Sequence, residues 1–258
     1  MKQELHAEWT KLRTVTGTGW LLLAIIILTV ALSAAATASV TCTSASCNYD
    51  AAKLSLTGVH LGQAAVAMLS VLAICAEYST GMIRTTLAAM PRRPTVLAAK
   101  AAILTSMTLA AGTVAVLGSV LAGRLLLPGS GFTPARGYPL LSLTDGPTLR
   151  AAAGSVLYLG LIALLSLGIA TAVRDSAAAI GVVVGLLYLF PLIIHMITDP
   201  DWQQRLWRIS PMNAGLTIQA TTNLPSLPIS PWAGLGVLAA WAAAALLGGG
   251  LLLRLRDA

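Results

Sequence analysis

The chain has 258 residues, of which 57% are hydrophobic and only 10% are charged. Soluble domains carry about 25% charged residues, so this composition excludes an ordinary soluble domain and indicates a membrane protein. The net charge of +7 does not indicate nucleic-acid binding, because the longest basic run is Arg92-Arg93 and cytoplasmic membrane loops are rich in Lys and Arg.

Residues 1–17 have the spacing of an amphipathic helix. Leu5, Trp9 and Leu12 lie at i, i+4 and i+7, and the basic residues fall elsewhere on the helical wheel. The pattern predicts a helix that lies in the membrane interface, with Trp9 at headgroup depth. A solvated, partly ordered tail is the alternative.

Six apolar segments are long enough to cross a bilayer, which takes about 20 residues. Continuous apolar runs of this length favour helices over the alternating strands of a barrel. The predicted spans are 19–40, 54–76, 101–123, 151–173, 177–197 and 232–253. We therefore predict an all-α integral membrane protein in which residues 1–258 form a single transmembrane domain.

The distribution of Lys and Arg predicts the orientation. With a cytoplasmic N-terminus, ten of the sixteen basic residues lie in the cytoplasm, and the densest cluster is 84–100. Both termini are therefore expected on the cytoplasmic side of the plasma membrane. A cleaved signal peptide is the alternative for the first span, since Ala36-Thr37-Ala38 resembles a cleavage site. Glu4, Glu8 and the length of the apolar run argue against cleavage.

The three cysteines are too few for a disulfide framework, and their spacing matches no zinc motif. Cys42 and Cys47 lie in one polar loop after the first span. An external loop is in an oxidising compartment, where this pair can form a disulfide. Two free cysteines in a polar turn are the alternative. Cys75, near the end of an apolar run, is predicted to be an inert helix residue.

Glycine and proline positions predict details of helix packing. Gly58 and Gly62 form a G-x-x-x-G pair, as do Gly181 and Gly185, and such pairs allow close helix contacts. Pro191 is expected to kink the fifth span.

Two long segments are predicted outside the spans on the external side. Residues 124–150 are rich in Pro and Gly and are predicted to form an irregular loop. Residues 198–231 contain Trp202, Leu206 and Ile209 at i, i+4 and i+7. We predict one or two short helices here that dip partly into the membrane, where protein can cover the backbone. A surface loop is the alternative.

The sequence contains no motif for enzyme chemistry. No Gly-Lys pair occurs, so the chain has no Walker A loop, and neither H-E-x-x-H nor G-x-S-x-G is present. His60 and His195 are the histidines near membrane depth, and both are better explained as polar packing residues than as proton carriers. We predict no catalytic, metal-binding or cofactor-binding residue in this chain.

The most informative segment follows the second span. Residues 77–100 carry five ionisable side chains, each costing roughly 3 kcal/mol at a bilayer centre, so the segment is expected outside the hydrocarbon. Ile83, Leu87 and Met90 lie at i, i+4 and i+7, and Pro91 ends the helical pattern. The pattern predicts a short helix parallel to the membrane, followed by re-entry. A plain amphipathic connector is the alternative.

Nine residues of this segment keep a characteristic order and spacing: Glu77, Tyr78, Gly81, Ile83, Arg84, Leu87, Pro91, Arg93 and Lys100. In this order the segment resembles that of a known family, the permease subunits of ABC transporters of the type-2 exporter family. Residues 8–14, EWTKLRT, are similar to the N-terminal helix of actinobacterial members, and the six-span topology with a re-entrant external segment is shared. Met82 departs from the family, where Thr is more common.

The resemblance implies an ATP-driven exporter made of two permease halves and two copies of a separate ATP-binding subunit, which holds ATP and Mg. Segment 77–92, including Arg92, would be the coupling helix that seats in a groove of the ATPase. Arg84 and Glu77 would make polar contacts to that partner. Ile83 and Leu87 would anchor the helix there or pack on the permease itself.

The expected cargo is a hydrophobic or amphipathic compound such as a drug, natural product, lipid or peptide. In the family, spans two and five usually line the transport path, which makes Gln63, Met68 and Tyr188 the candidate path residues in this chain. Two other functions remain open: a non-transporting sensory or scaffold membrane subunit, and an intramembrane enzyme. The absence of a paired acid, base or nucleophile argues against the enzyme.

Overall fold

A computed structural model describes residues 10, 16–42, 49–82, 93–133, 138 and 141–255. The described residues form helices and no strand, which confirms the predicted all-α fold. Six helical segments are long and apolar enough to cross a membrane, so the chain is a multi-pass membrane protein. They are α2 (Thr16–Ser39), α4 (Val59–Ser79), α6 (Arg93–Leu126), α7 (Gly146–Val173), the broken helix from α8 (Ser176–Val184) to α9 (Phe190–Met196), and α12 (Pro231–Leu255).

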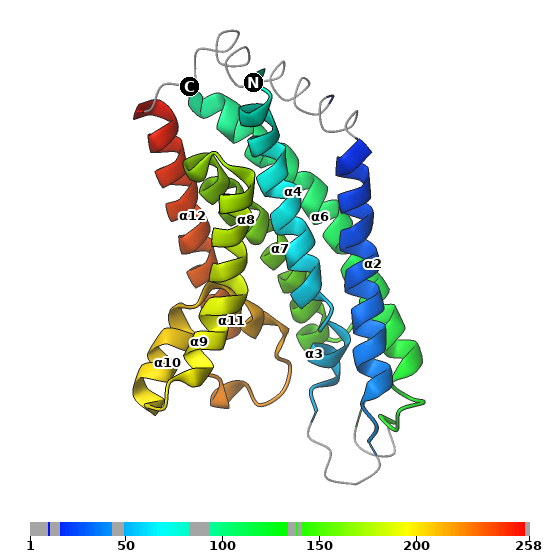
Figure 1. Ribbon diagram of the computed structural model, residues 1–258. Helices are drawn as coiled ribbons and strands as arrows, with labels where there is room; N and C mark the ends of the chain where they lie inside the picture. The colour runs from blue at the N-terminus through cyan, green and yellow to red at the C-terminus, as the bar shows by residue number, and fades with distance from the viewer. Residues whose placement is uncertain are drawn as a thin grey trace.

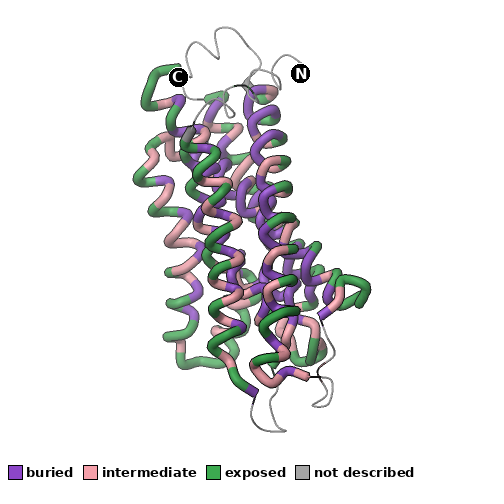
Figure 2. Tube along the Cα trace, turned by 90° about the vertical axis from the view of Figure 1, so that its right-hand side faces the viewer, coloured by how far each residue is buried: buried purple, intermediate pink, exposed green. Residues whose placement is uncertain are grey.

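The spans run side by side in one bundle (Figure 1). The start of α2 and the end of α12 lie at one end, which we call the terminal end, and α3 (Ala51–Ser55) lies at the opposite, loop end. Helix α7 packs against α4, α6 and α12 and forms the centre of the bundle. In the most apolar stretch of α4 and α7, 61% of residues are buried, against 22% in α2 and α12. Figure 2 shows the exposed residues along the outer sides of the spans.

The third span is longer than the predicted 101–123. Helix α6 has 34 residues, or about 51 Å at 1.5 Å per residue, which exceeds the roughly 30 Å of bilayer hydrocarbon. Pro94 is tolerated because the first turn of a helix has no intrahelical partner for its missing N–H. The helix therefore projects beyond the hydrocarbon.

The fifth span, for which a kink at Pro191 is predicted, changes its helical hydrogen bonding just before that residue. Residues Gly185–Leu189 form one π-helical turn (η2), and the Phe190 N–H bonds to the Gly185 carbonyl five residues back. Pro191 donates no hydrogen bond, and its ring crowds the carbonyl of the preceding turn, so the backbone widens just before it.

The segment before α12 contains the predicted short helices. They are α10 (Pro200–Ile209), α11 (Pro211–Leu216), and the 3₁₀ turns η3 (Thr217–Gln219) and η4 (Leu224–Ser226). Helix α10 has no buried residue, whereas α11 and η3 are largely buried and contact α7 and α12. Gly234 permits this packing, because a Cβ there would lie 2.0 Å from the Ala214 carbonyl oxygen.

A carboxylate fastens this segment to the loop that precedes α3. Asp50 caps α3 by accepting from the Lys53 N–H at 3.0 Å. The same side chain accepts from the Thr221 N–H at 2.5 Å, the Thr221 hydroxyl at 2.7 Å and the Thr222 N–H at 3.1 Å. We call these contacts the Asp50 clasp.

The two glycine pairs behave differently. A Cβ on Gly58 would lie 1.8 Å from the Thr29 carbonyl oxygen, and one on Gly62 would lie 2.2 Å from the Thr29 hydroxyl, so this pair brings α4 against α2 as expected. Gly181 has no atom within 4 Å of its Cβ position, and Gly185 meets only Leu189 of its own span. The second pair therefore makes no close helix contact within the described chain.

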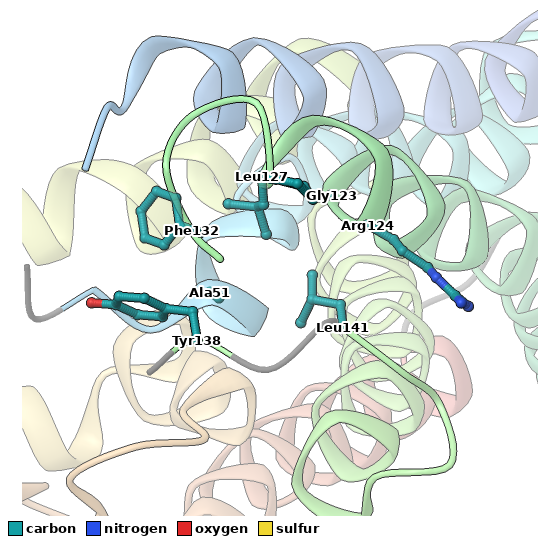
Figure 3. A pocket seen from close by; sticks show the side chains of 8 residues that line it. Ala51, Gly123, Arg124, Leu127, Phe132, Tyr138 and Leu141 are labelled. Carbon is teal, nitrogen blue, oxygen red and sulfur yellow. The ribbon is translucent and has the colours of Figure 1, made fainter. Parts of the chain in front are cut away.

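A small apolar cluster closes the loop end between α3 and the loop that follows α6 (Figure 3). Leu127, Phe132, Tyr138 and Leu141 converge on a hollow of only about 10 Å³, enough for one water at most. This hollow is too small for a ligand.

Cys42 is buried in that cluster and is disulfide-bonded, while Cys75 is free and buried. Cys47 lies outside the described residues, so its pairing with Cys42 stays a prediction. The predicted interfacial helix over 1–17 also lies outside the described residues, apart from residues 10, 16 and 17.

Candidate functional site

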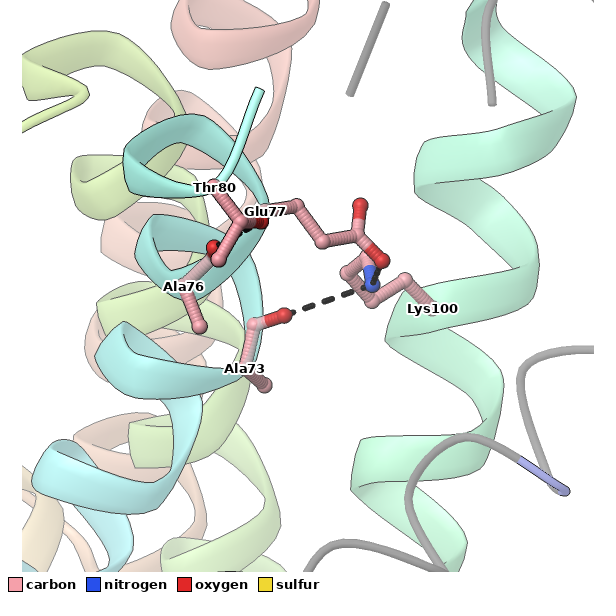
Figure 4. Close-up of polar contacts among 5 residues, drawn as sticks. All are labelled: Ala73, Ala76, Glu77, Thr80 and Lys100. Carbon is pink, nitrogen blue, oxygen red and sulfur yellow. Dashed lines mark hydrogen bonds and ion pairs between the residues drawn. The ribbon is translucent and has the colours of Figure 1, made fainter. Parts of the chain in front are cut away.

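Two opposite charges are buried between the second and third spans at the terminal end. Lys100 of α6 is 1% exposed and Glu77 of α4 is 6% exposed. The Lys100 Nζ lies 3.0 Å from the Glu77 Oε1 and also donates to the Ala73 carbonyl at 3.3 Å (Figure 4). The pair therefore joins α4 directly to α6.

Burial of either charge alone would be costly. Removing one partner of a buried pair typically costs about 3–5 kcal/mol, because the other charge stays desolvated. The Lys100 ammonium has a carboxylate and a carbonyl as acceptors, which explains how both charges fit inside apolar helices. Glu77 is near the end of α4, and Lys100 is near the start of α6. The pair therefore lies on either side of the segment that connects these two helices.

Contacts of Arg174 bring two further helices, α7 and α12, to the same end of α4. The Arg174 guanidinium carbon lies 5.4 Å from the ring centroid of Tyr78, a cation–π arrangement. Arg174 is the C-cap of α7, with φ of 66°, and its Nη2 donates to the Leu252 carbonyl of α12 at 3.4 Å. Asp175 then caps α8 by accepting from the Ala178 N–H at 2.8 Å.

We call Glu77, Tyr78, Lys100 and Arg174 the polar junction. Together they connect the terminal ends of α4, α6, α7 and α12 by an ion pair, a cation–π contact and a hydrogen bond. A force applied between α4 and α6 would therefore act on four spans together.

The structure describes only part of the sequence-predicted coupling segment. Gly81 is exposed with φ of 70°, a left-handed conformation suited to glycine, and it follows the end of α4. Arg93 is the first residue of α6, and its side chain lies outside the description. The remaining predicted contact residues also lie outside the described residues: Ile83, Arg84, Leu87, Pro91 and Arg92.

The three candidate path residues lie in different surroundings. Gln63 is fully buried, accepts a hydrogen bond from the Tyr158 hydroxyl and donates to the Met212 sulfur at 3.4 Å. The Tyr188 hydroxyl donates to the His60 carbonyl. Met68 is 39% exposed on the outer side of α4. Gln63 therefore ties α4 to α7 and α11 in this conformation.

Sequence reasoning missed the roles of Tyr158 and Arg174. Tyr158 is a hydroxyl-bearing side chain in the middle of a span, and such a group needs a partner when it is buried. Arg174 directly follows the apolar run of α7. A basic residue at that position is usually interpreted only as the end of a membrane span. In neither case does sequence spacing identify the partner.

Within the described ranges, no group of three His, Cys, Asp or Glu residues could hold a metal ion. No protein-family model matches the chain, and no curated protein matches it.

Proposed function

We propose that the chain is the membrane-spanning subunit of an ATP-driven exporter of the ABC type. In this proposal it works with a second permease copy or a related permease, and with two copies of a separate ATP-binding subunit that holds ATP and Mg. The cargo is a hydrophobic or amphipathic compound taken from the cytoplasm or the inner leaflet. The membrane is the plasma membrane, with both termini in the cytoplasm.

The observation that carries the proposal is the Glu77–Lys100 pair. When the ATPase is a separate protein, its conformational change must be transmitted to the membrane spans through a rigid contact. Segment 83–92 connects two helices that this buried pair locks together. A displacement of this segment would move α4 and α6 together. The contacts of Tyr78 and Arg174 would transmit that displacement to α7 and α12.

The apolar character of the spans supports the choice of cargo. Described charges within the spans gather near the helix ends, and the charge pair Glu77–Lys100 is already neutralised. A strongly ionic cargo would meet few counter-charges on its way through such a bundle.

The test is purification from native membranes in mild detergent, with and without the Arg84→Glu change. We expect an ATP-binding subunit with a Walker A motif to co-purify with the unmodified chain and to show ATPase activity. Arg84→Glu should lower that activity at least tenfold or abolish co-purification, because the change reverses the charge at the proposed contact.

The matched control is Arg208→Glu, a charge reversal on exposed α10 at the loop end. This variant should keep both the partner and the ATPase activity. Absence of any ATP-binding partner, or an Arg84→Glu complex with unchanged assembly and activity, would exclude the coupling role.

A further inference from the structure

A groove of about 670 Å³ lies between α6 and α12 at the terminal end. Its α6 wall includes Leu97 and Ala98, and its α12 wall includes Leu247 and Leu251. Among the lining residues that the structure describes, Arg254 alone is charged. Small-molecule sites typically have volumes of about 300–1,000 Å³, so the groove can hold a sizeable ligand.

The groove has the depth of one membrane leaflet. Its lining on α12 runs from Leu246 to Arg254, which is about 12 Å along the helix axis at 1.5 Å per residue. Half of the bilayer hydrocarbon is about 15 Å thick. Both walls belong to membrane-spanning helices, so the groove opens sideways to lipid.

The mouth of the groove favours negative charge. Arg254 is exposed in the last turn of α12, and within the described part of the chain it has neither a hydrogen bond nor an ion pair. The α6 wall begins at Pro94, in the first turn of that helix, where the helix dipole is positive, but the negative C-terminal end of α12 lies at the same mouth, so the two dipoles oppose each other. The Arg254 guanidinium therefore supplies the positive charge that an anion at this mouth would meet, and the groove below it is apolar.

We propose that this groove binds one anionic phospholipid, with the phosphate at Arg254 and an acyl chain between α6 and α12. Basic pockets between spans are a recognised type of site for anionic headgroups. The combination of a charged mouth and an apolar floor one leaflet deep matches the shape and charge of such a lipid. This inference does not depend on the ATP-binding partner.

Other occupants fit less well. A peptide segment would bring backbone N–H and C=O groups into an apolar lining, where each unpaired group is costly. A second copy of the chain would place an apolar helix there and would leave the Arg254 guanidinium without an anion. A zwitterionic lipid would fill the groove but would gain less from the positive mouth.

Gly250 offers a way to block the groove. It lies in the lining, and a Cβ there would be 3.4 Å from the Leu97 side chain, so Gly250→Phe would project into the groove. Gly248 is two residues away on α12, exposed, with nothing within 4 Å of its Cβ position. Gly248→Phe is therefore the matched control, and Ala98→Phe, at an exposed α6 position, is a second blocking variant.

The experiment is native mass spectrometry of the purified full-length chain, titrated with phosphatidylglycerol or with phosphatidylcholine. We expect one tightly bound phosphatidylglycerol, bound in preference to phosphatidylcholine. Gly250→Phe and Ala98→Phe should each abolish this binding, and Gly248→Phe should keep it. Arg254→Ala should weaken it about fivefold, which corresponds to roughly 1 kcal/mol for one basic residue near a lipid surface.

Several results would overturn the proposal. One is equal binding of both lipids, and another is phosphatidylglycerol binding that survives both blocking variants. A third is a blocking variant that converts a dimer to a monomer without changing lipid binding, which would assign the groove to a second copy. If Gly250→Phe does not fold, Ala98→Phe and Arg254→Ala decide the question.

Discussion

At the scale of single residues, the buried Glu77–Lys100 pair is the most unusual feature of the chain. Charged side chains are expensive in apolar helices, and here two of them are retained at 6% exposure or less. Each charge offsets the desolvation cost of the other through their 3.0 Å contact. The pair as a whole therefore contributes little to the free energy of unfolding, but removing either member alone is strongly destabilising.

We predict non-additive effects for this pair. Glu77→Gln and Lys100→Met should each destabilise the protein by about 3 kcal/mol, because each leaves one buried charge without its counter-charge. The double variant Glu77→Gln/Lys100→Met should recover most of that loss. Thermal unfolding of the purified variants in detergent measures the difference. Additive losses in the double variant would mean that the two charges do not depend on each other.

The sequence indicates these residues as special but does not indicate their pairing. Glu77 and Lys100 were expected outside the hydrocarbon because an isolated charge would be costly inside it. The cost of placing a charge in the hydrocarbon was estimated for each side chain alone. That estimate omits the 3.0 Å contact between these two residues, which are 23 positions apart in the sequence. That contact depends on how α4 and α6 pack, and helix packing is not encoded in local spacing.

At the scale of helices, the contact between α2 and α4 depends on the absence of a side chain. Gly58 allows its N–H to reach the Ser33 hydroxyl at 3.0 Å, and its Cβ position overlaps the Thr29 carbonyl oxygen. Small residues at such crossings permit backbone approach, and van der Waals contact then holds the helices together.

We expect Gly58→Val to push α2 away from α4. Overpacking of this kind typically costs about 1–3 kcal/mol, and here the obstructing atom is backbone, which cannot rotate aside. Gly181→Val is the control, because its Cβ position faces open space. The melting temperature in detergent should fall for the first variant and stay unchanged for the second. Equal behaviour of the two would show that the α2–α4 crossing adds no stability.

Helix positions could largely be predicted from hydropathy, whereas helix ends and interruptions could not. All six spans lie within a few residues of the apolar runs, except that α6 continues to Arg93. Lys100, which pairs with Glu77, lies in this extension. The burial of α11 against α7 and α12 depends on Gly234, whose role appears only once the two segments are packed together.

At the scale of the whole molecule, the two ends of the bundle differ in character. The terminal end holds the polar junction and the anion-favouring groove, and the loop end holds α10, the Asp50 clasp and the small apolar cluster. Under the proposed function the terminal end faces the cytoplasm. This assignment comes from the distribution of basic residues in the sequence.

Cysteine labelling of intact cells tests this assignment. Met82→Cys places a thiol at an exposed position three residues beyond the end of α4, and Gln204→Cys places one on exposed α10. We expect a membrane-impermeant maleimide to label the Gln204 variant in intact cells and the Met82 variant only after permeabilisation. The unmodified chain is the control, because Cys75 is buried. External labelling of the Met82 variant would reverse the orientation and remove the coupling proposal.

The Asp50 clasp has a consequence for any rearrangement at the loop end. A single carboxylate accepts hydrogen bonds from three groups of the stretch that leads into α12, and it also caps α3, which leads directly into α4. The starts of the second and the last span are thus linked at this end of the bundle. If these two spans separate there, all three hydrogen bonds must break together; otherwise the two spans move as one unit.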